Sequence, residues 1–241
     1  MSAETPSTVE TSYLGSNGKL LFKRAVWVLV ILLIIFPVVV GAVNILILKR
    51  VGLDTNPTIM YIFAGIQIVF QIAAWLLILL PYGANNRVKA FKIMFFIVAG
   101  TEFLRSFSSF ISAFGKSYTL YTQELFSPVI HTLSDVVGYL PVAAWIVFMV
   151  VVLCHPKTGK KLRKSSIFML ISYALVIAYS AASLSLLQLP NQDNTVVGES
   201  ILFFSFVLTI LLVGSQIYFF RAMALSEMKR DCVDTVMEAT I

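Results

Sequence analysis

The chain has 241 residues, of which 59% are hydrophobic and only 12% are charged. Soluble domains are about one quarter charged, so this composition, with its long apolar runs, excludes an ordinary soluble protein and predicts transmembrane helices. The net charge of +6 does not indicate nucleic-acid binding, because the basic residues are spread over short segments between the apolar runs and form no single patch.

The sequence divides into a central apolar region between two polar tails. Residues 1–22 are rich in Ser, Thr, Glu and Pro, so we expect a disordered cytoplasmic tail, and residues 222–241 form a second, charged tail. Residues 23–221 contain six apolar segments long enough to cross a bilayer. We therefore expect an all-α fold, an integral membrane bundle of six transmembrane helices. Their predicted bounds are 25–48, 57–81, 90–114, 128–154, 165–188 and 198–220.

The distribution of basic residues predicts the orientation of this bundle. With six helices, the opposite side from the termini holds only Lys49, Arg50 and Lys116. Because cytoplasmic connections carry the excess of Lys and Arg, we expect both the N-terminus and the C-terminus to be cytoplasmic. The fourteen basic residues on that side are Lys19, Lys23, Arg24, Arg87, Lys89, Lys92, Lys157, Lys160, Lys161, Arg163, Lys164, Arg221, Lys229 and Arg230.

The third apolar segment carries two charges near its middle, Glu102 and Arg105. At about 100° per residue, both fall on one helical stripe about 120° wide together with Ser109 and Ser112, and phenylalanines occupy the other side. The apolar residues of this segment contribute roughly −4 to −7 kcal/mol to insertion, and the two charges cost roughly +5 to +7 kcal/mol. The helix is therefore marginal alone, and we expect it to depend on its neighbours.

Ionisable groups inside a membrane are costly, which makes Glu102 and Arg105 candidates for an intramembrane polar site. One interpretation is a proton, ion or substrate site near the bilayer midplane. The other is a self-neutralised pair that fixes helix packing, because residues three apart on a helix are neighbours. Gln67 and Gln71, one turn apart in the second segment, would either line such a site or join helices by hydrogen bonds.

A second group of polar residues lies toward the predicted outer side. In the fourth segment His131, Ser134 and Asp135 share one helix face, and Asn44 lies in the outer part of the first segment. Together with the stripe of the third segment they predict a water-accessible pocket that opens to the outside. A metal site would need more ligands than His131 and Asp135, and His155 falls on the opposite side, so we expect no metal and no cofactor.

The two cysteines, Cys154 and Cys232, are both expected on the cytoplasmic side, where thiols stay reduced. Cys154 falls at a predicted membrane boundary beside a basic connection. It is therefore either a candidate for palmitoylation or an unmodified apolar residue.

The sequence lacks the common catalytic motifs, since it has no G-x-S-x-G, H-E-x-x-H or Walker A pattern. The first functional hypothesis is transport of a small solute or ion, or receptor-like sensing, through the outward-facing pocket. The second is a non-catalytic structural or accessory membrane subunit, and an intramembrane enzyme comes last. The expected partners are the lipid bilayer and proteins that bind the cytoplasmic tails, with no nucleic acid. The sequence does not identify a small-molecule ligand.

Overall fold

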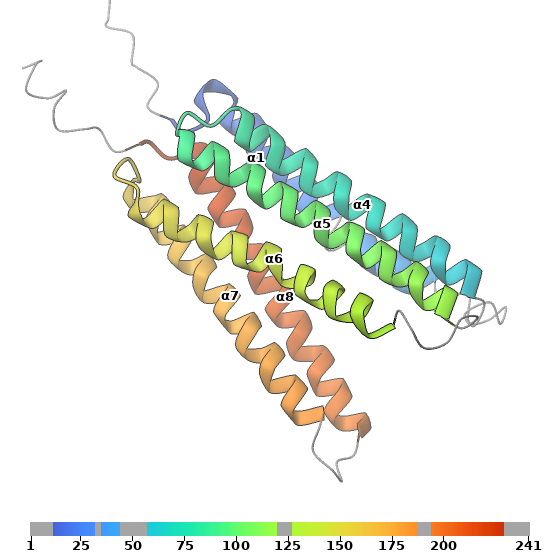
Figure 1. Cartoon of the computed structure of the whole chain (residues 1–241). Coiled ribbons are helices and arrows are strands. Elements are labelled where there is room, and N and C mark those ends of the chain that lie inside the picture. Colours follow the sequence, from blue (N-terminus) through green and yellow to red (C-terminus); the bar gives the residue numbers. More distant parts are fainter. Residues whose placement is uncertain (1–11, 32–34, 44–56, 120–126, 188–193, 229–241) are drawn as a thin grey trace, which may run out of the picture.

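The computed structural model describes residues 12–31, 35–43, 57–119, 127–187 and 194–228, and within these ranges the chain is all-helical (Figure 1). An isolated antiparallel bridge joins Ser12 to Glu227, and no strand occurs in the described ranges. The helices are η1 (Gly15–Asn17), α1 (Gly18–Val30), α2 (Phe36–Val43), α4 (Pro57–Ala84), α5 (Lys89–Thr119), α6 (Ser127–Cys154), α7 (Lys160–Leu187) and α8 (Asn194–Leu225).

Three of these helices are long and apolar enough to cross a membrane. The suitable stretches are Val136–Cys154 in α6, Lys160–Ser183 in α7 and Phe204–Leu225 in α8, and α4 contains a shorter apolar stretch, Ile68–Ala84. Length and composition therefore indicate a membrane protein.

Several helices extend beyond the predicted apolar segments at their basic ends. α7 begins at Lys160 rather than at residue 165, and α8 continues to Leu225 rather than ending at residue 220. Hydropathy locates only the apolar part of a helix, whereas Lys and Arg are good helix formers that continue it beyond the hydrocarbon. The expected N-terminal tail is also shorter than residues 1–22, because Tyr13 and Leu14 are buried and α1 begins at Gly18.

The helices converge at one end of the molecule and separate toward the other. α5 packs against both α4 and α6, α7 packs against α8, and α1 contacts α4 and α8. Figure 1 shows the pair α4 and α5 diverging from the pair α7 and α8 with distance from the C-terminal end of α8. We call the convergent end, which carries the turns at residues 85–88 and 155–159, the basic end, and the opposite end the open end.

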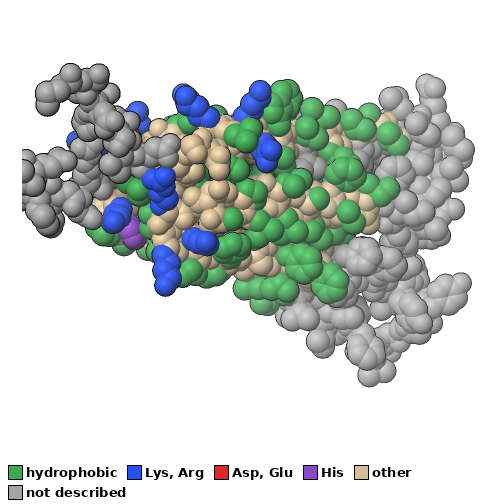
Figure 2. Space-filling model, turned by 90° about the horizontal axis from the view of Figure 1, so that it is seen from above, with side chains coloured by type: hydrophobic (Ala, Val, Ile, Leu, Met, Phe, Trp, Pro, Cys, Tyr) green, Lys and Arg blue, Asp and Glu red, His purple; other side chains and the backbone are tan. Residues whose placement is uncertain are grey.

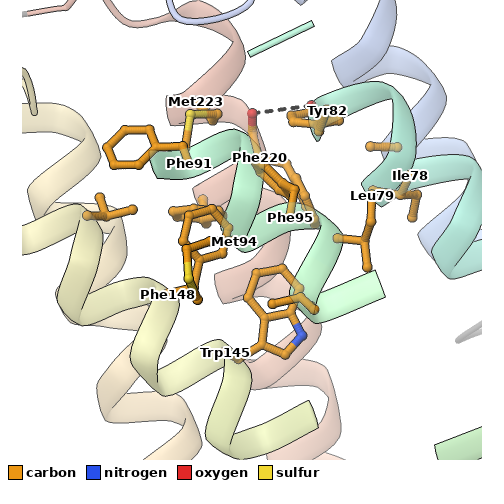
Figure 3. Packing of buried hydrophobic residues seen from close by; sticks show 14 of the residues in the cluster. Ile78, Leu79, Tyr82, Phe91, Met94, Phe95, Trp145, Phe148, Phe220 and Met223 are labelled. Carbon is orange, nitrogen blue, oxygen red and sulfur yellow. Dashed lines mark hydrogen bonds between the residues drawn. The ribbon is translucent and has the colours of Figure 1, made fainter. Parts of the chain in front are cut away.

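The core of the basic end is aromatic (Figure 3). Phe95 and Phe148 are fully buried and meet edge to face, with ring centroids 4.7 Å apart. Tyr82 meets Phe220 edge to face at 4.9 Å, and its hydroxyl donates a hydrogen bond to the Phe220 carbonyl at 3.3 Å. Such pairs contribute about 0.5–1.5 kcal/mol each beyond the area they bury, so they join α4, α5, α6 and α8 firmly.

One residue of the N-terminal segment, Tyr13, ties the basic end together. Its hydroxyl donates to the Lys157 carbonyl and accepts from the Gly159 N–H, both at 2.8 Å. Its own carbonyl accepts a hydrogen bond from the Arg87 N–H at 2.9 Å. We call this arrangement, together with the Ser12–Glu227 bridge, the Tyr13 junction, because it connects the N-terminal segment, both basic turns and the end of α8.

Two glycines allow the backbones at this end to approach closely. A Cβ atom on Gly18 would overlap the Ala224 carbonyl oxygen, and one on Gly159 would lie 2.8 Å from the Glu227 carbonyl oxygen. Only glycine fits such positions without a shift of the neighbouring backbone. The end of α8 is therefore held against α1 and against the turn before α7.

Candidate functional site

The candidate site is centred on the Glu102–Arg105 ion pair of α5. Arg105 Nη2 lies 2.9 Å from Glu102 Oε2, which places the two residues in contact along one face of the helix. Glu102 is 4% exposed, whereas the Arg105 side chain is 35% exposed. The pair therefore has an inner, buried acidic member and an outer, accessible basic member.

Polar groups from three other helices gather around this pair. Trp145 of α6 lies beside Glu102, and Tyr173 of α7 lies within electrostatic range of both charges. Gln216 of α8 donates from Nε2 to the Tyr173 hydroxyl at 3.3 Å. We call these residues, all buried except Arg105, the polar cluster: Glu102, Arg105, Ser106, Trp145, Tyr173 and Gln216.

The polar cluster contains buried atoms whose hydrogen-bonding capacity is unused. Ser106 Oγ makes no hydrogen bond within the described residues. The Trp145 indole N–H interacts with the Glu102 carboxylate short of full hydrogen-bond geometry, and Glu102 Oε2 contacts Arg105. Leaving a buried polar group unsatisfied costs about 1–3 kcal/mol. No other buried side-chain oxygen or nitrogen in the described part of the chain lacks a partner. One unused hydroxyl, Ser106 Oγ, therefore lies one helical turn from the Glu102 carboxylate.

The polar cluster lies well inside the bundle, measured from its basic end. Glu102 is ten residues beyond Lys92 and Trp145 is nine residues before Cys154, which at about 1.5 Å per residue places both roughly 15 Å from the basic end. That distance is about half the thickness of a membrane's hydrocarbon core, which is about 30 Å.

Several described side chains on the open-end side of the polar cluster are exposed. On the open-end side, Phe107 of α5, Tyr139 of α6 and Phe206 of α8 are all exposed. On the basic-end side, the aromatic core is closed. The polar cluster thus lies where the packed half of the bundle meets the half in which the helix pairs separate.

The structure brings together Glu102 and Arg105 among the predicted site residues, and Gln71 is half-buried on α4. Gln67 falls in α4, Ser109 and Ser112 in α5, and His131, Ser134 and Asp135 in α6, but their side chains are outside the described residues, as is Asn44 entirely. The predicted outer-side pocket therefore stays a prediction. Cys154 is the last residue of α6 and is exposed.

Sequence reasoning missed Trp145, Tyr173 and Gln216. Gln216 had a usable signal, because it is an amide in an apolar run at the same end of its segment as Arg221. Trp145 and Tyr173 had none, since hydropathy treats both as apolar and only their burial makes the N–H and hydroxyl groups significant. Within the described ranges no group of three His, Cys, Asp or Glu residues could hold a metal ion.

No protein-family model matches this chain, and neither a curated protein nor a solved structure matches it.

Proposed function

We propose that the chain crosses the membrane six times with both termini in the cytoplasm. In this arrangement α1 with α2, and each of α4, α5, α6, α7 and α8, forms one span. Two observations support it: the fourteen-to-three distribution of Lys and Arg residues, and the Tyr13 junction, which holds both basic turns and both terminal segments at one end. The separated helix pairs then face the outer side.

Within this bundle, we propose that the polar cluster binds a small polar solute or ion for transport or sensing, with access from the open end. The observation that carries this proposal is the buried Glu102 carboxylate, which contacts Arg105 and Trp145 and lies one turn from the unused Ser106 hydroxyl. Arg105, partly exposed beside it, adds positive charge at the mouth of the site. A ligand with both an acceptor and a donor or positive charge would match these groups.

Access from the open end is testable with single cysteines in a Cys154→Ser, Cys232→Ser background. Ser109→Cys and Ser112→Cys place thiols on the predicted polar stripe, and Phe107→Cys places a matched thiol on the opposite, phenylalanine-rich face. A membrane-impermeant maleimide applied to intact cells should label the first two and not the third. Resistance of both Ser109→Cys and Ser112→Cys would contradict a water-accessible path.

The role of the ion pair is testable by removing its charges singly and together. We compare Glu102→Gln, Arg105→Leu and the double variant by thermal unfolding of the purified protein in mild detergent. If the charges serve ligand binding, all three variants fold with similar stability, because the cluster is then held for a purpose other than packing.

A structural or accessory subunit is the second candidate, and the direct 2.9 Å contact within one helix favours it. Such a pair neutralises itself without an external ligand. In that case each single variant loses stability by leaving one charge buried, and the double variant recovers it. This outcome, combined with maleimide resistance at Ser109→Cys and Ser112→Cys, would favour a structural or accessory subunit over a transport protein.

A further inference from the structure

One buried serine of the polar cluster is held differently from the other buried serines of the described chain. Ser106 is 2% exposed, and its hydroxyl makes no hydrogen bond within the described residues. A serine in a helix usually satisfies its hydroxyl with a backbone carbonyl one turn earlier. The other five buried serines all do so: Ser165, Ser166, Ser172, Ser215 and Ser226. The Ser106 hydroxyl is therefore available to a partner other than the described backbone.

The Tyr173 hydroxyl of α7 has hydrogen-bonding capacity left as well. Its oxygen accepts a hydrogen bond from Gln216 Nε2 at 3.3 Å, and its own hydrogen has no acceptor within the described residues. Tyr173 is 4% exposed, and a buried tyrosine hydroxyl usually finds a partner. A second unused donor therefore lies inside the bundle, on a different helix from Ser106.

An acceptor for these two hydroxyls lies nearby on α5. Tyr173 is within electrostatic range of the Glu102 carboxylate, although no hydrogen bond joins the two side chains. Ser106 follows Glu102 by four residues, so at about 100° per residue both lie on one face of α5. Polar groups that are close without direct contact are often bridged by an ordered water.

The Glu102 carboxylate must be solvated from within the bundle. Figure 2 shows basic side chains gathered toward one end of the described surface, with no acidic side chain visible among the described residues of that face. Glu102 itself is 4% exposed. An ionised carboxylate has about four acceptor positions, and the contacts with Arg105 and Trp145 use only some of them. The carboxylate can therefore accept a further hydrogen bond from a donor held inside the polar cluster.

We propose that the polar cluster binds an ordered water molecule between Glu102 and Ser106 of α5 and Tyr173 of α7. The water donates to the Glu102 carboxylate, accepts from the Tyr173 hydroxyl and forms a third hydrogen bond with the Ser106 hydroxyl. Buried waters make about three hydrogen bonds to otherwise unsatisfied groups, and these three side chains supply that number. Because Tyr173 also binds Gln216, the water connects α5 with both α7 and α8. The proposal does not depend on transport, since the water would bind equally in a structural subunit.

The first test is thermal unfolding of the full-length Ser106→Ala variant in a mild detergent. With the water bound, this substitution removes one of its partners and should lower the unfolding temperature by about 2–4 °C, the shift expected for one hydrogen bond in a chain of this size. Without a partner for the hydroxyl, the substitution deletes an unsatisfied buried group and introduces a better helix former. An unchanged or higher unfolding temperature would therefore overturn the proposal.

A pair of substitutions tests whether Ser106 and Tyr173 bind the same water. The double variant Ser106→Ala/Tyr173→Phe should lower the unfolding temperature by less than the sum of the two single shifts, because both substitutions disturb one shared partner. The matched control is Ser106→Ala/Tyr218→Phe, since Tyr218 is 41% exposed and lies outside the polar cluster. The shifts of the control pair should add. Additive shifts in both pairs would contradict a shared water.

An experimental structure of the unmodified protein tests the site without any substitution, at a resolution that shows ordered water. We expect a density peak about 2.5–3.2 Å from the Glu102 carboxylate and from both hydroxyl oxygens. A direct hydrogen bond between Tyr173 and Glu102, or a polar cluster without this peak, would overturn the proposal. Maleimide labelling at Ser109→Cys and Ser112→Cys tests the transport proposal separately, so the two proposals can fail independently.

Discussion

The two ends of the bundle differ in how their helices are held. At the basic end, aromatic side chains fill the core, and Tyr13 binds segments far apart in the chain. Toward the open end, the described residues Val136, Phe206 and Ile210 are exposed, and the helix pairs diverge (Figure 1). The described contacts between distant segments of the chain are therefore concentrated at the basic end.

Removal of a core aromatic should give the largest difference between the two ends. Phe148 is fully buried and contacts the rings of Phe95 and Phe219, whereas Phe206 is 63% exposed. Phe148→Ala should lower the free energy of unfolding by about 3 kcal/mol, the low end of the usual range, because lipid rather than water solvates the separated helices. Phe206→Ala should change it by less than about 0.5 kcal/mol. Thermal unfolding in one detergent compares them, and similar losses would mean that the ends are packed alike.

The close approach of α1 to α8 gives the next largest effect. Gly18→Ala places a methyl group against the Ala224 carbonyl and should cost about 1–3 kcal/mol through overpacking. Gly100→Ala is the matched control, because no atom lies within 4 Å of its added Cβ. This control should be neutral or gain up to about 1 kcal/mol in helix propensity. A neutral Gly18→Ala in the same unfolding assay would show that the basic end tolerates movement.

Removal of the Tyr13 hydroxyl separates the contribution of the hydrogen bonds in the Tyr13 junction from the contribution of ring packing. Tyr13→Phe keeps the ring but leaves the Lys157 carbonyl and the Gly159 N–H without this partner. The expected loss is about 1–2 kcal/mol of unfolding free energy. If the stability were unchanged, the Tyr13 junction would be held together by the packing of the ring alone.

The same hydroxyl predicts a pH dependence at the basic end. Burial raises the pKa of Tyr13 above its ordinary value, despite the opposing Gly159 hydrogen bond and the Arg163 charge. Stability from the neutral hydroxyl is therefore complete below about pH 10 and is lost as the pH rises above it, because the unfolded tyrosine ionises first. The difference in stability between the unmodified protein and Tyr13→Phe should shrink above that pH. A difference that stays constant through the alkaline range would contradict this protonation linkage.

The smallest effect is expected at an exposed position of the basic end itself. Cys154→Ser should change the unfolding free energy by less than about 0.5 kcal/mol, because the side chain is exposed and makes no disulfide. A thiol reagent should also label Cys154 in the folded protein. A large loss would mean that position along the bundle matters more than burial.

The helical fold was predictable because long apolar runs leave the backbone few alternatives in lipid. The exact helix ends were not, since α7 starts among lysines that hydropathy reads as a loop. Tyr13 was also beyond prediction: it is an isolated aromatic in a polar segment, and its partner Lys157 is 144 residues away. No local pattern records a contact of that kind.

The polar cluster, like the fold, could be predicted from the sequence only in part. The Glu102–Arg105 contact follows from their spacing on one helix, which is a local property. The approach of Trp145, Tyr173 and Gln216 depends on how α6, α7 and α8 are rotated, which is a tertiary property. Sequence therefore located the charged centre of the polar cluster and not the groups that surround it.

The Tyr13 junction also constrains the order in which the chain is assembled during synthesis. Tyr13 precedes the described helices, yet its partners are Lys157 and Gly159, and Ser12 pairs with Glu227 beyond α8. The contacts of Tyr13 therefore form only after α6 and the turn that follows it have been translated, and the Ser12–Glu227 bridge forms only after α8. Closure of the basic end is then a late step of assembly, and a chain truncated before α8 would leave Ser12 without its Glu227 partner.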